Sequence, residues 1–192
     1  MKARARQATA LVCMLLAGAA AQARDTKKKP RIDELAAVRQ AEALLVSYRL
    51  PDAVSAETLE TLQSGQGLTF QHRIEARWVR GFWLPDRLLA RTTLEVRVEY
   101  DALTRQYVLT RETTREVREG EVAPEPLVEQ QTTADPLELR RWMEEIREVP
   151  LEPAAPPEPG PVDVRVRVQL GRHYVLLLFP AAISVSAELR VP

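Results

Sequence analysis

Alternating apolar and polar positions dominate the middle of the chain. Over residues 68–78 every second position is apolar except His72, which is expected to face the same side, with mostly Gln, Arg and Glu between them, and the same pattern returns over residues 88–100. Successive side chains of a strand point to opposite faces, so a period of two predicts two long antiparallel strands, each with one buried face. Residues 101–104 are then expected to form a turn, and residues 106–112 the returning arm of a hairpin.

Further strands are expected towards both ends. Residues 43–50 have strand composition and stop at Pro51, alternation returns over residues 162–170, and residues 174–179 and 183–191 supply the last pieces of sheet. The pattern therefore predicts an α+β domain. Its main element is an antiparallel meander of about six strands, apolar on one face and lined with Arg and Glu on the other, with one or two short helices packed on it.

Helix signals appear at three places. Residues 55–64 begin with a serine that can cap a helix and end before Gly65. A second helix is expected from Pro136, after Asp135, to about Arg147, with Leu139, Trp142, Met143 and Ile146 spaced for one apolar face. Residues 32–43 contain helix formers, and we expect either a short helix there or a frayed entry into the first strand.

The first 23 residues have the layout of a secretory signal peptide: a basic start, a short apolar run, and the small-residue triplet that contains Ala21 and Ala23. We predict cleavage between Ala23 and Arg24 and export of the remainder. The alternative is that the segment stays uncleaved and anchors the domain in the inner membrane. Membrane contact is expected only in that second case.

The rest of the chain divides into a leader and a domain. Residues 24–40 include three consecutive lysines, and we expect a flexible polar leader there. Residues 41–192 are expected to form a single β-rich domain, with a stiff proline-rich surface connection over residues 149–161. Cys13 lies inside the predicted signal peptide, so the exported part would contain neither a disulfide nor a thiolate site.

The residue inventory offers little to catalysis. The 27 basic and 27 acidic residues balance, which does not favour a nucleic-acid partner. Neither histidine, His72 or His173, lies near a nucleophile motif, and no metal-ligand spacing or phosphate-binding glycine cluster is present in the sequence. We therefore predict a non-enzymatic protein without catalytic residues, metal or cofactor. A hydrolase that uses two carboxylates is a weaker alternative, for which no pair of acids stands out.

One group of side chains points to binding. Trp78, Phe82, Trp83 and Leu84 crowd the junction of the two longest strands. Aromatic residues at such a junction can close the end of the core, form a binding hot spot or enter a membrane interface. Two hypotheses follow: contact with an envelope protein through this turn or an exposed sheet edge, or transport of an apolar ligand such as a lipid on the apolar face of the sheet.

Three stretches carry a family resemblance: Gln66–Phe70 (QGLTF), Arg77–Asp86 (RWVRGFWLPD) and Tyr100–Leu109 (YDALTRQYVL). They resemble a family of exported Gram-negative bacterial proteins catalogued as a domain of unknown function (DUF4390), some of them labelled proline-rich signal-peptide proteins. The resemblance covers most of the chain from about Ala41. It departs over residues 186–192, where the family usually has a tryptophan-bearing strand.

This resemblance implies a single exported, periplasmic domain. It brings no known activity and no catalytic residues. Genes of the family often lie near a membrane sensor kinase, which implies an accessory role in envelope signalling.

Overall fold

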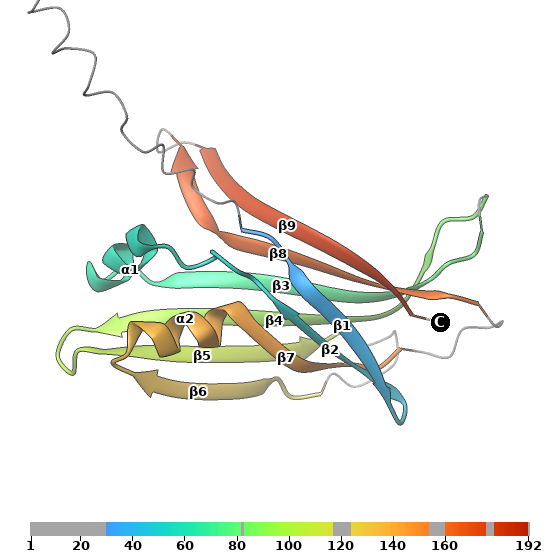
Figure 1. Ribbon diagram of the computed structural model, residues 1–192, viewed down its shortest axis with the longest axis horizontal. Helices are drawn as coiled ribbons and strands as arrows, with labels where there is room; N and C mark the ends of the chain where they lie inside the picture. The colour runs from blue at the N-terminus through green and yellow to red at the C-terminus, as the bar shows by residue number, and fades with distance from the viewer. Residues whose placement is uncertain (1–29, 82, 117–123, 154–159, 176–178, 192) are drawn as a thin grey trace, which may run out of the picture.

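The computed structural model describes residues 30–81, 83–116, 124–153, 160–175 and 179–191. The predicted signal peptide and its cleavage site lie outside these ranges. Two antiparallel sheets and two short helices form the described part of the chain (Figure 1). In chain order the elements are β1 (Asp33–Gln40), β2 (Ala43–Arg49), α1 (Ala56–Gln63), β3 (Leu68–Trp78), β4 (Arg87–Asp101), β5 (Gln106–Arg115), β6 (Leu127–Thr133), α2 (Pro136–Glu144), β7 (Glu145–Leu151), β8 (Val162–Val175) and β9 (Phe179–Val191).

The larger sheet confirms the predicted fold class. It has six antiparallel strands in the order β6-β5-β4-β3-β8-β9. Strands β3 to β6 follow one another as a meander, and the β8–β9 hairpin adds to the free side of β3. Strand β3 has the predicted bounds, and it pairs with β4 from Leu68 opposite Val98 to Trp78 opposite Arg87.

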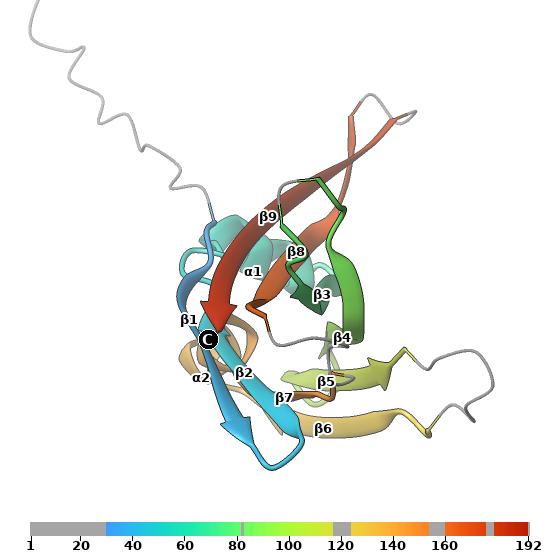
Figure 2. The ribbon, with the colours of Figure 1, turned by 90° about the vertical axis from the view of Figure 1, so that its right-hand side faces the viewer.

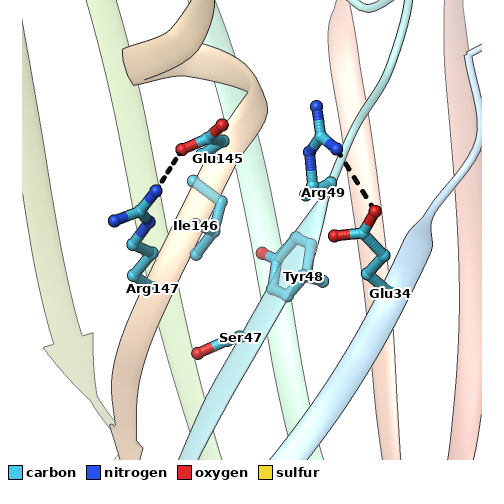
Figure 3. Close-up of a pocket in the computed structure, with 7 residues that line it drawn as sticks. All are labelled: Glu34, Ser47, Tyr48, Arg49, Glu145, Ile146 and Arg147. Atoms are coloured by element: carbon cyan, nitrogen blue, oxygen red, sulfur yellow. Dashed lines mark hydrogen bonds and ion pairs between the residues drawn. The ribbon is translucent and has the colours of Figure 1, made fainter.

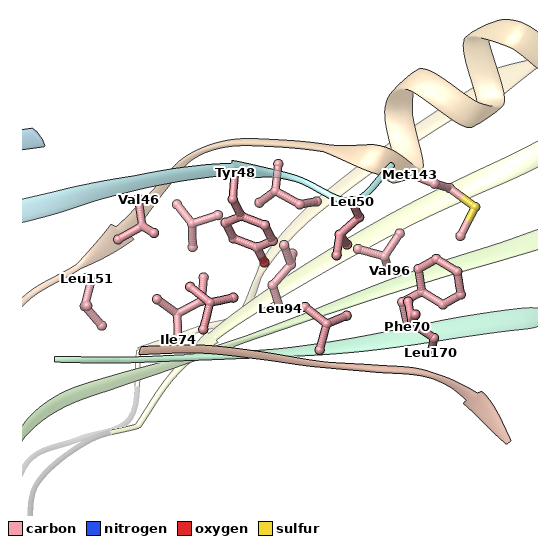
Figure 4. Close-up of a cluster of buried hydrophobic side chains, with 14 of the residues drawn as sticks. Val46, Tyr48, Leu50, Phe70, Ile74, Leu94, Val96, Met143, Leu151 and Leu170 are labelled. Carbon is pink, nitrogen blue, oxygen red and sulfur yellow. The ribbon is translucent and has the colours of Figure 1, made fainter. Parts of the chain in front are cut away.

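A second sheet, not expected from the sequence, covers the apolar face of the first. Strand β2 lies at its centre between β1 and β7, and the three strands cross the larger sheet (Figures 1 and 2). Alternate residues of the β2 segment, from Leu44 to Leu50, point inward and are almost fully buried. They meet the inward rows of β3, β4 and β8 in one core, which Figure 4 shows in section.

The expected helix or frayed entry over residues 32–43 is wrong. Residues 33–40 form β1, so the leader predicted to reach residue 40 is too long at that end. These residues have helix-forming composition, but Leu35 and Ala37 pack against the core, and backbone pairing with β2 satisfies their peptide groups. Ala41 adopts a left-handed conformation (φ 52°) in the turn between the two strands. Tertiary pairing overrides propensity here.

The second predicted helix begins as expected and ends early. Asp135 caps it by accepting a hydrogen bond from the Leu137 N–H (2.9 Å), and Pro136 opens it. It ends at Glu144 instead of continuing to Arg147, because the next residues pair with β2 as strand β7. Ile146 is 1% exposed in that strand, so the apolar spacing that suggested a longer helix also suits a strand facing the core.

The remaining predictions have mixed outcomes. Helix α1 is confirmed, and the Ser55 side chain accepts a hydrogen bond from the Thr58 N–H (3.1 Å). Residues 149–151 of the predicted proline-rich connection belong to β7, while residues 154–159 lie outside the described ranges. Strand β6 was not predicted, since its mostly polar sequence lacks apolar alternation.

Candidate functional site

The turn between β3 and β4 contains the predicted binding residues, and the structure separates them. Trp78, the last residue of β3, is 9% exposed and belongs to the core. Trp83 is 90% exposed and Leu84 is 56% exposed in the turn, which lies at the right-hand end of the sheet in Figure 1. Phe82 lies outside the described residues. The aromatic group therefore divides into a buried base and an exposed tip.

Backbone contacts fix the base of this turn. The Val79 N–H donates to the carbonyl oxygen of Pro161 (3.1 Å), so the end of the proline-rich connection lies against the end of β3. A Cβ added to Gly160 would lie 2.5 Å from Nε1 of Trp78, so a residue without a side chain is needed at this close approach. Trp78 is thus held between the core and the connection.

The tip is also ordered by its own contacts. The Arg80 guanidinium donates two hydrogen bonds to the carbonyl oxygen of Pro85, at 2.9 Å from Nε and 2.7 Å from an Nη atom. Gly81 has a φ of 96°, a conformation that residues with a side chain rarely adopt. These contacts close the turn below Trp83.

The opposite end of β4 provides a comparison. There the β4–β5 turn exposes Leu103 (96%), and the Asp101 carboxylate accepts hydrogen bonds from the N–H groups of Leu103 and Thr104. These hydrogen bonds hold the pKa of Asp101 below its ordinary value. A single exposed leucine is common on protein surfaces, whereas an exposed tryptophan beside a leucine is less so.

Among the sheet edges, β6 is the most open to another strand. β1 runs beside β9, and β7 contains Pro150 and a left-handed residue, Glu148 (φ 54°). Strand β6 pairs with β5 without a register shift, contains no proline, and is exposed from Leu127 to Thr132. An unprotected edge can add a partner strand through main-chain hydrogen bonds. It is the second candidate contact surface.

A shallow depression of about 300 Å³ lies between β1, β2 and β7 (Figure 3). It is lined by Glu34, Ser47, Tyr48, Arg49, Glu145, Ile146 and Arg147. The charged residues pair with each other: Arg49 with Glu34 at 3.2 Å, and Arg147 with Glu145 at 2.6 Å. Because these charges are already compensated, the depression gives little indication of a ligand.

A polar contact joins the two sheets inside the core. The Tyr48 hydroxyl and Nδ1 of His72 lie 2.7 Å apart, and both side chains are buried, which confirms that His72 faces the apolar side of its strand. Burial, assisted by the nearby charge of Arg111, lowers the pKa of His72 to about 3. Burial likewise raises the pKa of the Tyr48 hydroxyl. Both groups are therefore neutral at physiological pH.

Arg111 of β5 lies near the Tyr48–His72 contact and binds the end of α2. Its guanidinium lies 4.1 Å from the centre of the Trp142 ring and donates to the carbonyl oxygens of Trp142 and Glu145, the latter at 2.9 Å. It thereby satisfies carbonyl groups where α2 gives way to β7. The arrangement holds β5, α2 and β7 together, and we infer a structural role for it.

The described ranges also bear on two other features, a metal site and a membrane-spanning helix. Their His, Cys, Asp and Glu side chains form no group of three that could hold a metal ion. Neither α1 nor α2, the helices of those ranges, has the length and hydropathy of a membrane-spanning helix.

Comparison with known proteins gives one match. Residues 27–179 match the model of a family described as Domain of unknown function (DUF4390). Neither the curated proteins nor the solved structures contain a match to the chain.

Proposed function

Since the chain belongs to the DUF4390 family, whose description assigns no activity, we propose a function from its own surface. The protein is exported to the periplasm and acts without catalysis, by binding another protein of the cell envelope through the β3–β4 turn. We propose that this contact gives the protein an accessory role in envelope signalling.

The exposure of Trp83 carries the proposal. Tryptophan buries a large apolar area on binding and is enriched among the residues that dominate binding energy at interfaces. Here it is 90% exposed, next to the half-exposed Leu84. The fixed base of the turn, from Trp78 to Gly81, lowers the conformational entropy that binding would cost.

The packing of the core favours this proposal over an apolar-ligand carrier. The apolar face of the large sheet is covered by β1, β2, β7 and the helices, and most inward side chains of β3, β4 and β8 are 0–9% exposed. The depression in Figure 3 lies outside that core and is lined mainly by charged and polar groups. A carrier would have to separate the two sheets to admit a lipid.

Photo-crosslinking in living cells tests the proposal. A photoreactive residue replaces Trp83, Leu103 or Gln130 in the full chain, which places the probe at the proposed contact, at the opposite turn, or on edge strand β6. We expect position 83 to yield one adduct of defined mass that position 103 does not give. The purified partner should then bind the Trp83→Ala variant much more weakly than the Leu103→Ala variant.

The same experiment can contradict the proposal. Equal adducts from positions 83 and 103, or unchanged affinity of Trp83→Ala, would show that the turn is not the contact surface. An adduct from position 130 alone would move the contact to the edge of β6. Circular dichroism of each variant shows whether a loss of binding reflects loss of the fold.

A further inference from the structure

The outer face of the six-stranded sheet carries ordered rows of charge. In two neighbouring rows, residues directly opposite each other on adjacent strands have opposite charge. Glu75 of β3 bonds Arg91 of β4 at 2.9 Å, and it also bonds Arg77 of its own strand at 2.8 Å. On the same face, between β8 and β9, Arg165 bonds Glu188 at 3.0 Å and Arg190 bonds Asp163 at 2.8 Å.

The next row places like charges opposite each other. Arg73 of β3 lies directly opposite Arg167 of β8. Both are exposed, and neither forms an ion pair or a side-chain hydrogen bond with another described residue. The nearest carboxylate along β3 is Glu75, which Arg77 and Arg91 already hold. Like charges directly opposite each other destabilise a sheet, so the fold does not explain this pair.

The row of the two arginines continues with neutral polar residues, and so does the row on one side of it, whereas Glu75 and Arg165 face each other in the row on the other side. Thr93 lies opposite Arg73, and Ser186 lies opposite Arg167, so the row runs from hydroxyl to hydroxyl across four strands. Gln71 and Gln169 face each other in the next row. The two guanidinium groups are positively charged hydrogen-bond donors. The hydroxyl and amide groups beside them can each donate to an acceptor as well.

A pair of opposite sign lies beside them. Glu95 of β4 and Glu112 of β5 also face each other, one row further along the sheet. Glu95 bonds Arg97 at 2.5 Å, while Glu112 has no ion pair with another described residue. The face therefore presents two arginines without an ion pair to the described residues next to two facing glutamates, of which only Glu112 lacks one.

We propose that Arg73 and Arg167 together bind a carboxylate on the surface of a partner protein. Guanidinium groups match the two oxygens of a carboxylate in bidentate geometry, and two of them can bind one acidic side chain from both sides. A uniformly anionic membrane would be repelled by Glu95 and Glu112, whereas a protein surface can oppose both signs at once. The inference rests on the proposed function as a protein-binding molecule and names the chemistry of the partner.

The test uses peptides of opposite charge and leaves Trp83 intact. Fluorescent hexaglutamate and hexalysine peptides, and vesicles of anionic phospholipid, are titrated with the purified protein at fixed ionic strength. We expect hexaglutamate to bind, and the Arg73→Gln/Arg167→Gln variant to lose affinity for it by about tenfold or more. The Arg165→Gln variant is the matched control, because that arginine is already paired with Glu188, and it should retain the affinity.

Charge reversal and stability sharpen the test. The Arg73→Glu/Arg167→Glu variant should bind hexalysine more tightly than hexaglutamate, the reverse of the wild type. Without peptide, Arg73→Gln should unfold at the same or a higher temperature than the wild type at low salt, because repulsion is removed, whereas Arg165→Gln should not gain stability. Equal hexaglutamate affinity in the wild type and the double glutamine variant overturns the inference.

Two other outcomes separate the alternatives. Binding of anionic vesicles but not of hexaglutamate overturns the inference in favour of a lipid surface. Because neither peptide assay depends on the β3–β4 turn, hexaglutamate binding with a negative crosslink at position 83 would leave the arginine pair in place and refute only the turn as a contact surface.

Discussion

The two faces of strand β3 have very different surroundings. Phe70, His72 and Ile74 point into the space between the sheets and are at most 2% exposed, whereas Gln71 and Arg73 face solvent. On the inner face an unmatched polar atom is costly, so His72 meets the Tyr48 hydroxyl there. On the outer face most charges are hydrated, and pairing between exposed charges contributes little to stability.

This difference decides how much each face constrains the sequence. The inner row must fill the space between the sheets, and a buried polar atom there that lacks a hydrogen-bond partner, such as Nε2 of His72, costs free energy. The outer row is free to depart from the most stable arrangement, as the facing arginines 73 and 167 do. Departures on the outer face are therefore better evidence of binding than departures inside. Four predictions test the contrast.

The largest effect is expected from Ile74→Ala. Ile74 is fully buried at the centre of β3, and removing most of its side chain leaves a cavity between the sheets. We expect the free energy of unfolding to fall by about 2–5 kcal/mol, measured by urea denaturation. Gln71→Ala, on the outer face of the same strand, should change it by about 0.5 kcal/mol or less. Equal losses from the two variants would break the comparison.

The second effect is a loss of stability in mild acid caused by His72. Its pKa is about 3 in the folded protein and about 6.5 in an unfolded chain. As the pH falls below 6.5, the unfolded state binds a proton that the folded state does not. The free energy of unfolding should therefore fall with a slope approaching about 1.4 kcal/mol per pH unit, and should be independent of this group above pH 6.5.

Between pH 6.5 and 5, comparison with a variant that lacks His72 isolates this effect, because Glu144, whose pKa burial raises, contributes a slope of opposite sign in both proteins. Glu75 and Asp163 also have lowered pKa values, but they lose their contribution below the ordinary carboxyl range. For Asp163 the hydrogen bond from Arg190 is the main cause, while for Glu75 burial opposes the shift and the hydrogen bonds of Arg77 and Arg91 outweigh it. Urea denaturation of Tyr48→Phe/His72→Leu should show a flatter pH dependence in this window. An unchanged slope would refute the buried neutral histidine.

An intermediate effect is expected from Gly160→Ala. The added Cβ would lie 2.5 Å from Nε1 of Trp78 at the end of the inner row, so the ring or the connection must shift. We expect a loss of about 1–3 kcal/mol in the free energy of unfolding. Tryptophan fluorescence should report the displaced ring. Gly67→Ala, whose new Cβ would meet neighbours at 3.6 Å, is the control and should change far less.

The smallest effect is expected on the outer face. Glu75→Gln removes the charge that Arg77 and Arg91 share, and Arg165→Gln removes a more exposed partner of Glu188. We expect losses of about 1 kcal/mol and about 0.5 kcal/mol respectively, both reduced by added salt. A loss from Glu75→Gln as large as that from Ile74→Ala would show that the charged face determines the fold as strongly as the core does.

The sequence predicted the elements whose signal is local. Alternation located β3 and most of β4, and capping residues located the start of α1 and of α2. It missed β1, whose residues have helix-forming composition, and β6, which lacks apolar alternation. It also missed the change from α2 to β7, because that segment becomes a strand by pairing with residues far away in the sequence. Glu145, for example, pairs with Arg49, 96 positions earlier in the chain.

The candidate sites show the same division. The sequence singled out Trp78 and Trp83 together, since both are aromatic residues near one turn. Only the packing of Gly160 and Pro161 on the end of β3 made one of them core and left the other exposed. The facing arginines could not be predicted, because a shift of one residue in the β3–β8 register would put different residues opposite each other.

The sequence by itself therefore determined that this is an α+β protein built on an antiparallel sheet with one apolar face. Period-two patterning is enough for that, because each strand has to bury one row of side chains wherever its partner lies. The tertiary structure alone decided what covers that face, how Tyr48 meets His72, and which charges are left without a partner. Those features depend on strand pairing and register between segments distant in sequence, and no local pattern encodes them.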